Sequence, residues 1–426
     1  MKKILIISCH FPPSNLAGIH RGRLFAQHLN RFGWEPIVLT VNEKYYEEPP
    51  DLNILKLLPP DLRVEKVNAF KLSKARMIGD LGLRAFFQLY SKAVKLVKQE
   101  KIDFLFIIIP SFYTALLGRL VHWRTGVPYG IDYMDPWVHK FPGSEKKFSR
   151  AWWSTKLASI LEPFAVKRAK LITGVAEGYY QGVADRYPHL KKTSVFGAMP
   201  VGGEKEDHFK VSKLSLEPYL FKKNPGKIQM VYAGTMWPPA LPVINAVFQS
   251  ISENPASFKD VEFHFIGTYV SANDPQGYMK PIAEKWGIWQ KQIFEYPNRI
   301  PYMDALIHLE ASSGIFIFGS VQPHYTPSKV YQAVLSAKPI MSVLHSASSA
   351  VGIIRNSGAG VVLDFNGEED VKKIRSEFAN KFAEYVVLLR NWNPANVKHS
   401  MLEQYSAEKV TEQLAKVLEQ AYEKAV

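Results

Sequence analysis

Two stretches of the chain open alike and decide the fold: ILIISCHFPPSNLAGIHRGRLFAQHL at 4–29 and IQMVYAGTMWPPALPVINAVF at 228–248. Each begins with a short apolar run that is typical of a buried strand. A loop that holds a glycine follows, and then a segment with helical spacing. A strand, a glycine-bearing loop and a helix open a Rossmann-like domain. The repeated opening therefore predicts two such domains in tandem.

Short apolar runs alternate with longer amphipathic segments through both halves. The predicted strands are Ile4–Ser8, Pro36–Val41, Arg63–Val67, Phe104–Pro110, Tyr129–Tyr133 and Leu171–Val175, then Ile228–Ala233, Val261–Ile266, Ile293–Tyr296, Gly314–Phe318, Pro339–Leu344 and Gly360–Leu363. The predicted helices of the first half are 18–32, 82–100, 111–125 and 146–169. This alternation predicts an α/β protein whose parallel sheets are covered on both faces.

The alternation pauses in a polar segment rich in Gly, Pro and Lys, at 198–227. We interpret that segment as a linker. The expected domains are then 1–197 and 228–399. Residues 400–426 carry apolar side chains at helical spacing and predict a terminal amphipathic helix.

Composition limits the class of protein. Of 426 residues, 47% are hydrophobic and 22% are charged, which is ordinary for a globular chain. The single cysteine, Cys9, excludes a disulfide framework and fits a reducing compartment. The longest apolar run, Phe104–Pro110, is too short to cross a bilayer.

The net charge of +14 resides entirely in the first 200 residues. Such a bias suggests an anionic partner: a phospholipid surface, a nucleic acid or a phosphorylated ligand. A basic surface with no dedicated partner explains it equally well. Zinc-finger and RNP motifs are absent from the sequence, so we expect no nucleic acid.

Several familiar motifs are missing. The sequence has no Walker A loop, no G-x-S-x-G, no H-E-x-x-H and no clean G-x-G-x-x-G. It has no Asp-x-Asp pair to hold a divalent cation, and its twelve histidines lack metal-ligand spacing. We therefore expect neither a metal nor a nicotinamide cofactor.

The order of the remaining motifs resembles the retaining glycosyltransferases of GT-B fold, a nucleotide-sugar-dependent group (glycosyl transferases group 1, family-four-like) that builds bacterial surface polysaccharides. The matching segments are HFPPSNLAGIHR, FGWEPIVLT, IIIPSFYTALLGRL, GVPYGIDYMDPW, ITGVAEGYY, VYAGT, FHFIGT, TPSKVYQAVLSAKPI and NSGAGVVL. The resemblance implies two Rossmann-like domains facing each other across a cleft, with the C-terminal helix returning to the N-terminal domain.

The resemblance also implies which domain binds which substrate. The C-terminal domain would bind the nucleotide sugar and the N-terminal domain the acceptor. Donor contacts would come from Gly18, Arg21, Gly234, Thr235, Tyr296 and Ser328. Arg21 would reach the donor phosphates, and Tyr296 would lie near the base.

This sequence departs from the family in the donor helix. Two glutamates are common there, and the matching positions hold His324 and Gln332. The basic pair usual after the first strand of the second domain is replaced by Met236-Trp237-Pro238-Pro239. Lys329 is then the best remaining cation for the diphosphate. Lys329, Arg21 and His324 are the expected catalytic residues, and Gln332 is expected to contact the donor.

DYMDPW follows a predicted strand end in the first half. Asp132 and Asp135 could accept hydrogen bonds from sugar hydroxyls, and Trp137 could stack on a pyranose. We predict an acceptor site from these three residues. The alternative is an Asp turn and helix cap before Pro136.

The segment 146–170, KKFSRAWWSTKLASILEPFAVKRAK, bears on the charge bias. Trp152, Leu157, Ile160, Leu161 and Phe164 can share one side of a helix. Basic side chains flank them, an arrangement that favours a membrane surface. The alternative is a helix that packs on its own sheet. Both hold if Trp153 and the cations face outward.

The sequence therefore predicts a cytoplasmic glycosyltransferase, with a peripheral position on the inner face of the cell membrane. It would move a sugar from a nucleoside-diphosphate sugar to a glycan or lipid-linked acceptor, with retention and without a metal or other cofactor. Two alternatives stay open. One is a nucleotide-sugar epimerase, and the other is a non-catalytic glycan- or nucleotide-binding subunit of the same fold.

Overall fold

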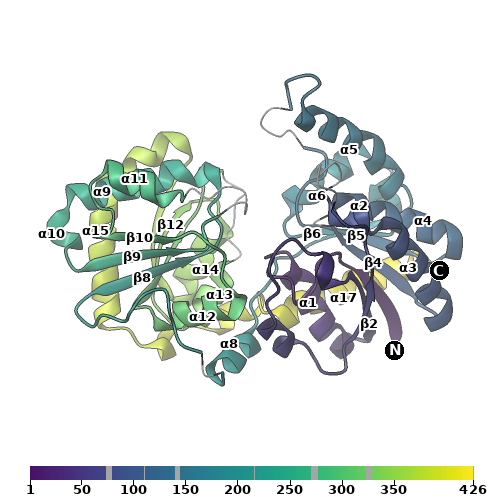
Figure 1. The fold of residues 1–426 in the computed structure, drawn as a ribbon, viewed down its shortest axis with the longest axis horizontal. Coiled ribbons are helices and arrows are strands. Elements are labelled where there is room, and N and C mark those ends of the chain that lie inside the picture. Colours follow the sequence, from purple (N-terminus) through teal and green to yellow (C-terminus); the bar gives the residue numbers. More distant parts are fainter. Residues whose placement is uncertain are drawn as a thin grey trace. The chain divides into compact units, whose positions relative to one another are not determined.

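The computed structural model describes residues 1–72, 79–109, 111–139, 144–214, 216–269, 277–322 and 329–425. The chain forms two compact units, which are drawn in Figure 1. The first unit consists of Met1–Val201 and Ala407–Val426, and the second of Gly202–Ser406.

The first unit is built on a seven-stranded parallel sheet in the order β3-β2-β1-β4-β5-β6-β7. Its strands are β1 (Lys2–Ile7), β2 (Trp34–Val41), β3 (Arg63–Val67), β4 (Phe104–Ile109), β5 (Tyr129–Tyr133), β6 (Leu171–Gly174) and β7 (Val195–Ala198). Its helices are α1 (Ile19–His28), α2 (Leu81–Arg84), α3 (Phe86–Glu100), α4 (Ala115–Thr125), α5 (Arg150–Val166), α6 (Glu177–Arg186), α7 (Leu190–Thr193) and α17 (Ala407–Glu423).

Strand β1 shows why the sheet is covered on both faces. Its side chains alternate between two hydrophobic cores, as the pleat of a strand requires. Ile4 and Ile6 pack in the core that α1 and α17 complete, whereas Leu5 and Ile7 belong to the core formed with α3 and α4. A strand buried on both faces reads as a continuous apolar run, and this explains the KKILII sequence.

The second unit repeats the plan with a six-stranded parallel sheet in the order β10-β9-β8-β11-β12-β13. Its strands are β8 (Ile228–Ala233), β9 (Val261–Ile266), β10 (Ile293–Tyr296), β11 (Gly314–Phe318), β12 (Ile340–His345) and β13 (Gly360–Phe365). Its helices are α8 (Lys205–Ser212), α9 (Leu241–Glu253), α10 (Pro255–Phe258), α11 (Met279–Lys285), α12 (Tyr302–Ala311), α13 (Lys329–Leu335), α14 (Ser349–Ser357), α15 (Val371–Arg390) and α16 (Ser400–Glu403).

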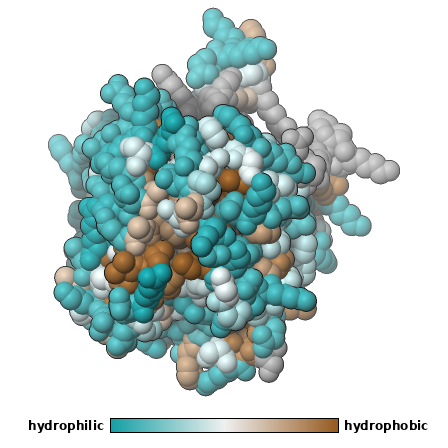
Figure 2. Space-filling model, turned by 90° about the vertical axis from the view of Figure 1, so that its left-hand side faces the viewer, coloured by the Kyte–Doolittle hydropathy of each residue, from teal (hydrophilic) through white to brown (hydrophobic). Residues whose placement is uncertain are grey.

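Aromatic side chains fill the core between this sheet and helices α9 and α15. Phe258 stacks on Phe378, with ring centroids 5.8 Å apart and planes at 4°. Phe263 meets Phe316 edge to face. The side of this unit that Figure 2 presents is mostly hydrophilic, with hydrophobic residues gathered in one area of the view.

The sequence-based expectations hold for the fold class, since both sheets are parallel and helices cover them. The structure adds β7, a short strand at the edge of the first sheet that was not predicted. The segment 198–227, expected to be a linker, contains helix α8. The predicted terminal helix is divided into α16 in the second unit and α17 in the first. Within the described ranges, no helix is long and apolar enough to span a membrane.

A buried ion pair ties the middle of the first unit together. Arg21 on α1 donates through Nε and Nη2 to the two carboxylate oxygens of Asp132 on β5, both at 2.8 Å. Its Nη1 donates to the carbonyls of Met199 (2.6 Å) and Pro200 (2.8 Å), just after β7. Thr173 on β6 donates to Asp132 at 2.6 Å. Both charged side chains have no exposed surface.

We expect Asp132→Ala to destabilise the first unit by about 3–5 kcal/mol, because the variant leaves a buried guanidinium without its counter-charge. Urea unfolding followed by tryptophan fluorescence measures the loss. The matched control replaces both partners, Arg21→Met with Asp132→Leu, and we expect it to cost less than the single change. A loss below about 1 kcal/mol for Asp132→Ala would show that the pair does not hold the unit together.

Candidate functional site

The carboxyl edge of the second sheet is where this fold class binds ligands, at the point where the strand order reverses. That point lies between β8 and β11, which pair in parallel. Gly234 and Thr235 follow β8, and helix α13 begins at Lys329, after β11. Two of the predicted donor residues and the predicted diphosphate lysine therefore belong to one edge of the sheet.

Lys329 lies directly over Gly234 and Tyr232. Its Nζ donates to the Tyr232 hydroxyl at 2.6 Å and sits 3.9 Å from the centre of the Tyr232 ring. The Tyr232 hydroxyl in turn donates to the carbonyl of Thr235 at 3.0 Å. An aromatic face and a hydroxyl thus hold the ammonium. Within the described residues, no carboxylate forms an ion pair with Lys329.

Burial without a counter-charge changes the acidity of Lys329. Although part of the residue stays accessible, the surrounding protein removes water from the ammonium and lowers its pKa to about 7. An unpaired cation in a site poor in water attracts an anion strongly, since an anion would restore the lost charge compensation. The position is therefore a candidate anion site.

Gly234 makes room for this arrangement. An ideal Cβ at Gly234 would lie 2.5 Å from Lys329 Nζ and 2.9 Å from its Cε. The φ angle of Gly234 is 140°, which L side chains rarely adopt. Both facts explain why glycine stands here. Its predicted place at the phosphate end of a donor site stays a prediction.

A second cation reaches the same edge. Arg299, in the loop after β10, donates through Nη2 to the Thr235 hydroxyl at 3.2 Å. Arg299 is exposed, so its guanidinium can also meet a ligand in solvent. The sequence analysis missed Arg299. The signal that could have found it is its place after a predicted strand, next to the predicted residue Tyr296.

Glu295 is a carboxylate at this edge whose role is structural. It accepts hydrogen bonds from the backbone nitrogens of Tyr278, Met279 and Lys280 at the start of α11, at 3.0–3.1 Å. It also accepts from the Thr268 hydroxyl at 2.6 Å. Glu295 therefore satisfies the free N–H groups of a helix start, and its oxygens are occupied.

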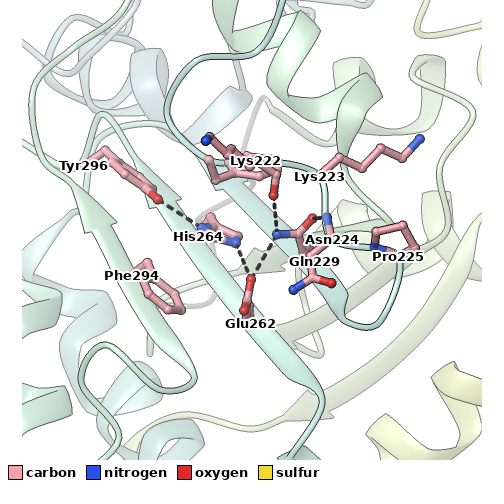
Figure 3. Close-up of a pocket in the computed structure, with 10 residues that line it drawn as sticks. Lys222, Lys223, Asn224, Pro225, Gln229, Glu262, His264, Phe294 and Tyr296 are labelled. Carbon is pink, nitrogen blue, oxygen red and sulfur yellow. Dashed lines mark hydrogen bonds and ion pairs between the residues drawn. The ribbon is translucent and has the colours of Figure 1, made fainter.

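Tyr296 turns its side chain away from this edge and onto the face of the sheet. There it lines a cavity of about 420 Å³, shown in Figure 3, together with His264 and Phe294. Its hydroxyl lies 3.3 Å from His264 Nδ1, and His264 Nε2 lies 3.3 Å from Glu262. Only the backbone of Tyr296 belongs to the edge, where its carbonyl accepts from the Gly267 N–H at 2.8 Å.

The cavity wall fixes the protonation of His264. Its ring stacks between Phe221 and Phe294, with centroids 4.3 Å and 5.1 Å away. Burial lowers the pKa of His264 to about 4, although Glu262 opposes the shift. The imidazole is therefore neutral at pH 7. Burial also raises the pKa of Tyr296 to about 12, so its hydroxyl keeps its proton.

The other predicted donor residues have mixed outcomes. Gln332 on α13 is held by His208 of α8, whose Nε2 lies 2.9 Å from the amide oxygen of Gln332. His208 Nδ1 lies 3.3 Å from Glu310 on α12. His324 and Ser328 lie outside the described residues.

In the first unit, the structure places the predicted residues Arg21 and Asp132 against each other. Every polar atom of the Arg21 guanidinium already donates to Asp132 or to the carbonyls of Met199 and Pro200. In this conformation neither side chain offers a surface to a phosphate or a sugar. We therefore assign both a positioning role. Gly18 is the N-cap residue of α1 and has ordinary helical φ and ψ angles.

Trp137 is buried, which differs from its predicted place on a sugar. Its ring stacks on Phe112 with planes at 5° and meets Tyr113 edge to face. Only 4% of Trp137 is exposed, so it is a core residue. Asp135 is exposed instead. The surrounding protein still raises the pKa of its carboxyl, with His139 acting in the opposite direction.

Further polar side chains that the sequence analysis missed gather at the carboxyl edge of the first sheet. His10 follows β1, and burial lowers its pKa while Glu48 and Asp80 oppose the shift. Its Nδ1 is buried without a hydrogen-bond partner. Asp80 accepts from the Ser111 hydroxyl at 2.7 Å, and Ser111 follows β4. The rule that ligands bind at strand ends could have found His10 and Ser111.

The described residues can also be considered as ligands for a metal ion. Among them, no group of three or more His, Cys, Asp or Glu side chains is placed to hold an ion. The polar edges of both sheets instead offer cations, amides, hydroxyls and single carboxylates. Such groups suit the recognition of phosphates and sugar hydroxyls.

Comparison with known proteins gives matches only among solved structures. No protein-family model and no curated protein matches the chain. A glycosyltransferase from Rickettsia africae is 14% identical, with coverage of 99% of this chain and 98% of that one and a TM-score of 0.59. Anabaena HepE, solved with UDP-glucose, is 13% identical, with coverage of 99% and 100% and a TM-score of 0.62.

A UDP-forming α,α-trehalose-phosphate synthase from Burkholderia xenovorans is 13% identical and has a TM-score of 0.64, with 99% of each chain covered. In all three cases the match extends over both units. The chain therefore has the two-domain GT-B fold, and the predicted resemblance is confirmed at the level of the fold. At this identity the likeness carries the architecture and not the activity.

We expect one lysine of the protein to titrate near pH 7, because burial disfavours the charged form of Lys329. NMR of protein labelled with ¹³C at lysine Cε follows each ammonium through a pH titration. Lys329→Met should remove the resonance that titrates near 7. The control Lys227→Met, at the opposite end of β8, should leave it in place. If every lysine titrates near its ordinary value of about 10.4, the desolvated ammonium does not exist.

Proposed function

We propose that the protein transfers a sugar from a nucleoside-diphosphate sugar to a glycan or lipid-linked acceptor, with retention, in polysaccharide or glycan biosynthesis. The observation that carries the proposal is the desolvated ammonium of Lys329 over Gly234, at the switch point of the second sheet. Anabaena HepE, which has the same fold and was solved with UDP and with UDP-glucose, supports the donor class.

The reaction needs a place for negative charge. The bond between the anomeric carbon and the diphosphate oxygen breaks, and the acceptor oxygen bonds to that carbon. The acceptor proton passes to the leaving diphosphate, as the resemblance implies for retaining enzymes. A bound diphosphate raises the pKa of Lys329, so the ammonium is charged when the leaving group develops its charge. Lys329 then stabilises the transition state electrostatically, with Arg299 as a second cation.

We assign the acceptor to the first unit. Asp135 is the exposed carboxylate of the predicted acceptor motif, and His10 carries an unpaired Nδ1 at the same edge of the sheet. A carboxylate that accepts from a hydroxyl and an imidazole that can accept or donate suit a sugar acceptor. Tyr296, Gln332, His324 and Ser328 remain donor-side proposals, Tyr296 through its backbone only. No metal or other cofactor enters this mechanism.

We also propose a cytoplasmic site of action. Cys9 is buried, and burial raises the pKa of its thiol, so the thiol is protonated and inert. A protein with one such cysteine gains nothing from an oxidising compartment.

The function is tested by donor turnover. The protein is incubated with a panel of nucleoside-diphosphate sugars, and released nucleoside diphosphate is measured with and without acceptor extracts. We expect slow release from one donor without acceptor, and NMR of the product should show a retained anomeric configuration. Interconversion of the donor sugar without its release would identify an epimerase. Binding without turnover would identify a non-catalytic subunit.

Lys329→Ala should weaken binding of that donor's nucleoside diphosphate about 10- to 100-fold, because a charge-assisted hydrogen bond of about 1.5–3 kcal/mol is lost. Binding of the corresponding nucleoside should change little. Isothermal titration calorimetry measures both. Lys227→Ala, which removes a lysine at the other end of β8, is the matched control and should bind both ligands normally. Equal weakening of both ligands by Lys329→Ala would show that Lys329 does not contact phosphate.

Asp135→Asn should lower the rate of transfer to the acceptor at least tenfold while donor affinity stays unchanged, because the change removes one charged acceptor from the first unit only. The control is Asp185→Asn, an exposed aspartate on α6 of the same unit. Steady-state kinetics with varied acceptor and calorimetry with the donor product separate the two effects. A matching fall in donor affinity would overturn the assignment of substrates to units.

A further inference from the structure

Helix α5 is anchored to the first unit by one side. Ser149 begins the helix, and its hydroxyl accepts from the Trp152 N–H at 3.0 Å. Ala158 and Ala165 are buried on the inner side. Glu162 is fully buried there as well and accepts two hydrogen bonds from Arg186 on α6, at 2.9 Å and 2.7 Å. The rotation of the helix about its axis is therefore fixed.

The opposite side of α5 exposes an apolar row. Trp153, Leu157, Ile160 and Phe164 follow each other at the four- and three-residue spacing that forms one stripe of a helix. Their exposed fractions are 55%, 42%, 63% and 44%, and Phe148, just before the helix, is 74% exposed. We call these five residues the α5 surface. Trp152 and Leu161, expected on the same side, are half-buried instead.

The helix buries apolar side chains on its inner side and also exposes a row of them on its outer side, which is unusual for a helix at the surface of a folded unit. The inner side packs against α4 and the core of the unit, and Ala158, Ala165 and Val166 belong to that core. The outer row leaves much of its apolar surface in contact with water. Large exposed apolar rows of this kind mark a surface that meets another apolar phase.

Cations surround the α5 surface. Exposed basic side chains precede it, interrupt it and follow it along the chain: Lys146, Lys147, Lys156, Lys167 and Arg168. Between residues 144 and 170 the only acidic side chains are Glu145 and the buried Glu162. The whole net charge of +14 lies in the first 200 residues, to which the α5 surface belongs.

We propose that the α5 surface docks the first unit on an anionic lipid bilayer. The apolar row would enter the boundary between headgroups and acyl chains, and the cations would meet lipid phosphates. Trp153 suits that boundary, because an indole is apolar over most of its area and carries one polar N–H. A second copy of the chain fits less well, since a symmetric contact would bring the same cations together.

The inference does not depend on the proposed function, because docking involves neither Lys329 nor a nucleotide. It gives the positive charge of the first 200 residues a role that the donor site in the second unit cannot, since the second unit, Gly202–Ser406, holds 20 basic and 19 acidic residues and so has a net charge of only +1. A protein on a bilayer would also lie close to a lipid-linked acceptor.

The experiment is vesicle flotation with the full chain and no nucleotide. Vesicles of phosphatidylcholine alone are compared with vesicles that contain phosphatidylglycerol, at low and at high salt. We expect flotation with the anionic vesicles at low salt and release at high salt, because exposed charges are screened beyond about 8 Å at physiological ionic strength. Each cation at the surface should contribute about fivefold to the partition coefficient.

Two variants separate the apolar and the charged part. Trp153→Ser with Ile160→Ser removes apolar area, and Lys146→Glu with Lys147→Glu reverses two charges. Each pair should lower the partition coefficient at least 20-fold while the melting temperature and nucleotide binding stay normal, since all four side chains are exposed. The matched control is Phe209→Ser in the second unit, an aromatic side chain that is 53% exposed beside Lys213. That variant should float like the unchanged protein.

Three results would overturn the proposal. The first is absence of flotation with anionic vesicles at low salt. The second is equal, salt-independent binding to neutral and anionic vesicles. The third is a dimer, seen by analytical ultracentrifugation, that Ile160→Ser dissociates, because the row would then be a contact between copies. Nucleotide binding measured on the same preparations shows whether the proposed function stands when docking fails.

Discussion

The first unit depends on the buried pair of Arg21 and Asp132. A guanidinium and a carboxylate without exposed surface are costly to remove from water, and they are tolerated because every polar atom of the guanidinium is bonded. The pair joins α1 to β5, Thr173 joins the same carboxylate to β6, and two carbonyls join Arg21 to the chain after β7. Four elements thus converge on one charge pair at the carboxyl edge of the sheet. The positions of the loops at that edge, and therefore of any acceptor site there, follow from this constraint.

Lys329 is also a cation removed from water, but its charge is not compensated by a carboxylate in the described part of the chain. There, only a hydroxyl and an aromatic ring compensate it. The protein therefore keeps it partly neutral, with a pKa of about 7, instead of pairing it. The guanidinium of Arg21 is compensated inside the fold by Asp132. The ammonium of Lys329, in a site shaped by Gly234, would be compensated only by a bound anion, so it favours anion binding. The sequence analysis assigned both cations to the donor phosphates through the family resemblance, Arg21 from the loop after the first strand and Lys329 from the donor helix. The buried carboxylate partner, which only the fold reveals, distinguishes them.

The sequence predicted the strands well because a parallel sheet covered on both faces leaves continuous apolar runs, such as FLFIII in β4. It missed β7, VFGA, because an edge strand of four residues with a glycine carries little of that signal. Lys329 and Gly234 were predicted from the family resemblance and do lie together. Arg299 was missed because an exposed arginine in a polar loop looks like any solvated cation. Trp137 was misplaced because an aromatic residue beside aspartates suits a sugar and a core equally, and the stacking partner Phe112 lies 25 residues earlier.

Two features of this chain are unfavourable in the isolated protein. An ammonium without a counter-ion costs free energy at the edge of the second sheet, and an exposed apolar row costs free energy on α5. Neither is needed for folding: the core of each unit is complete without them. The two costs would be relieved in different ways. A bound anion would compensate the ammonium of Lys329, whereas an apolar phase bordered by negative charge would cover the exposed row on α5. One unit thus carries the features of a phosphate site and the other those of a lipid contact. A transferase that joins a water-soluble donor to a membrane-borne acceptor would need both, and the two requirements would fall on separate units of the chain.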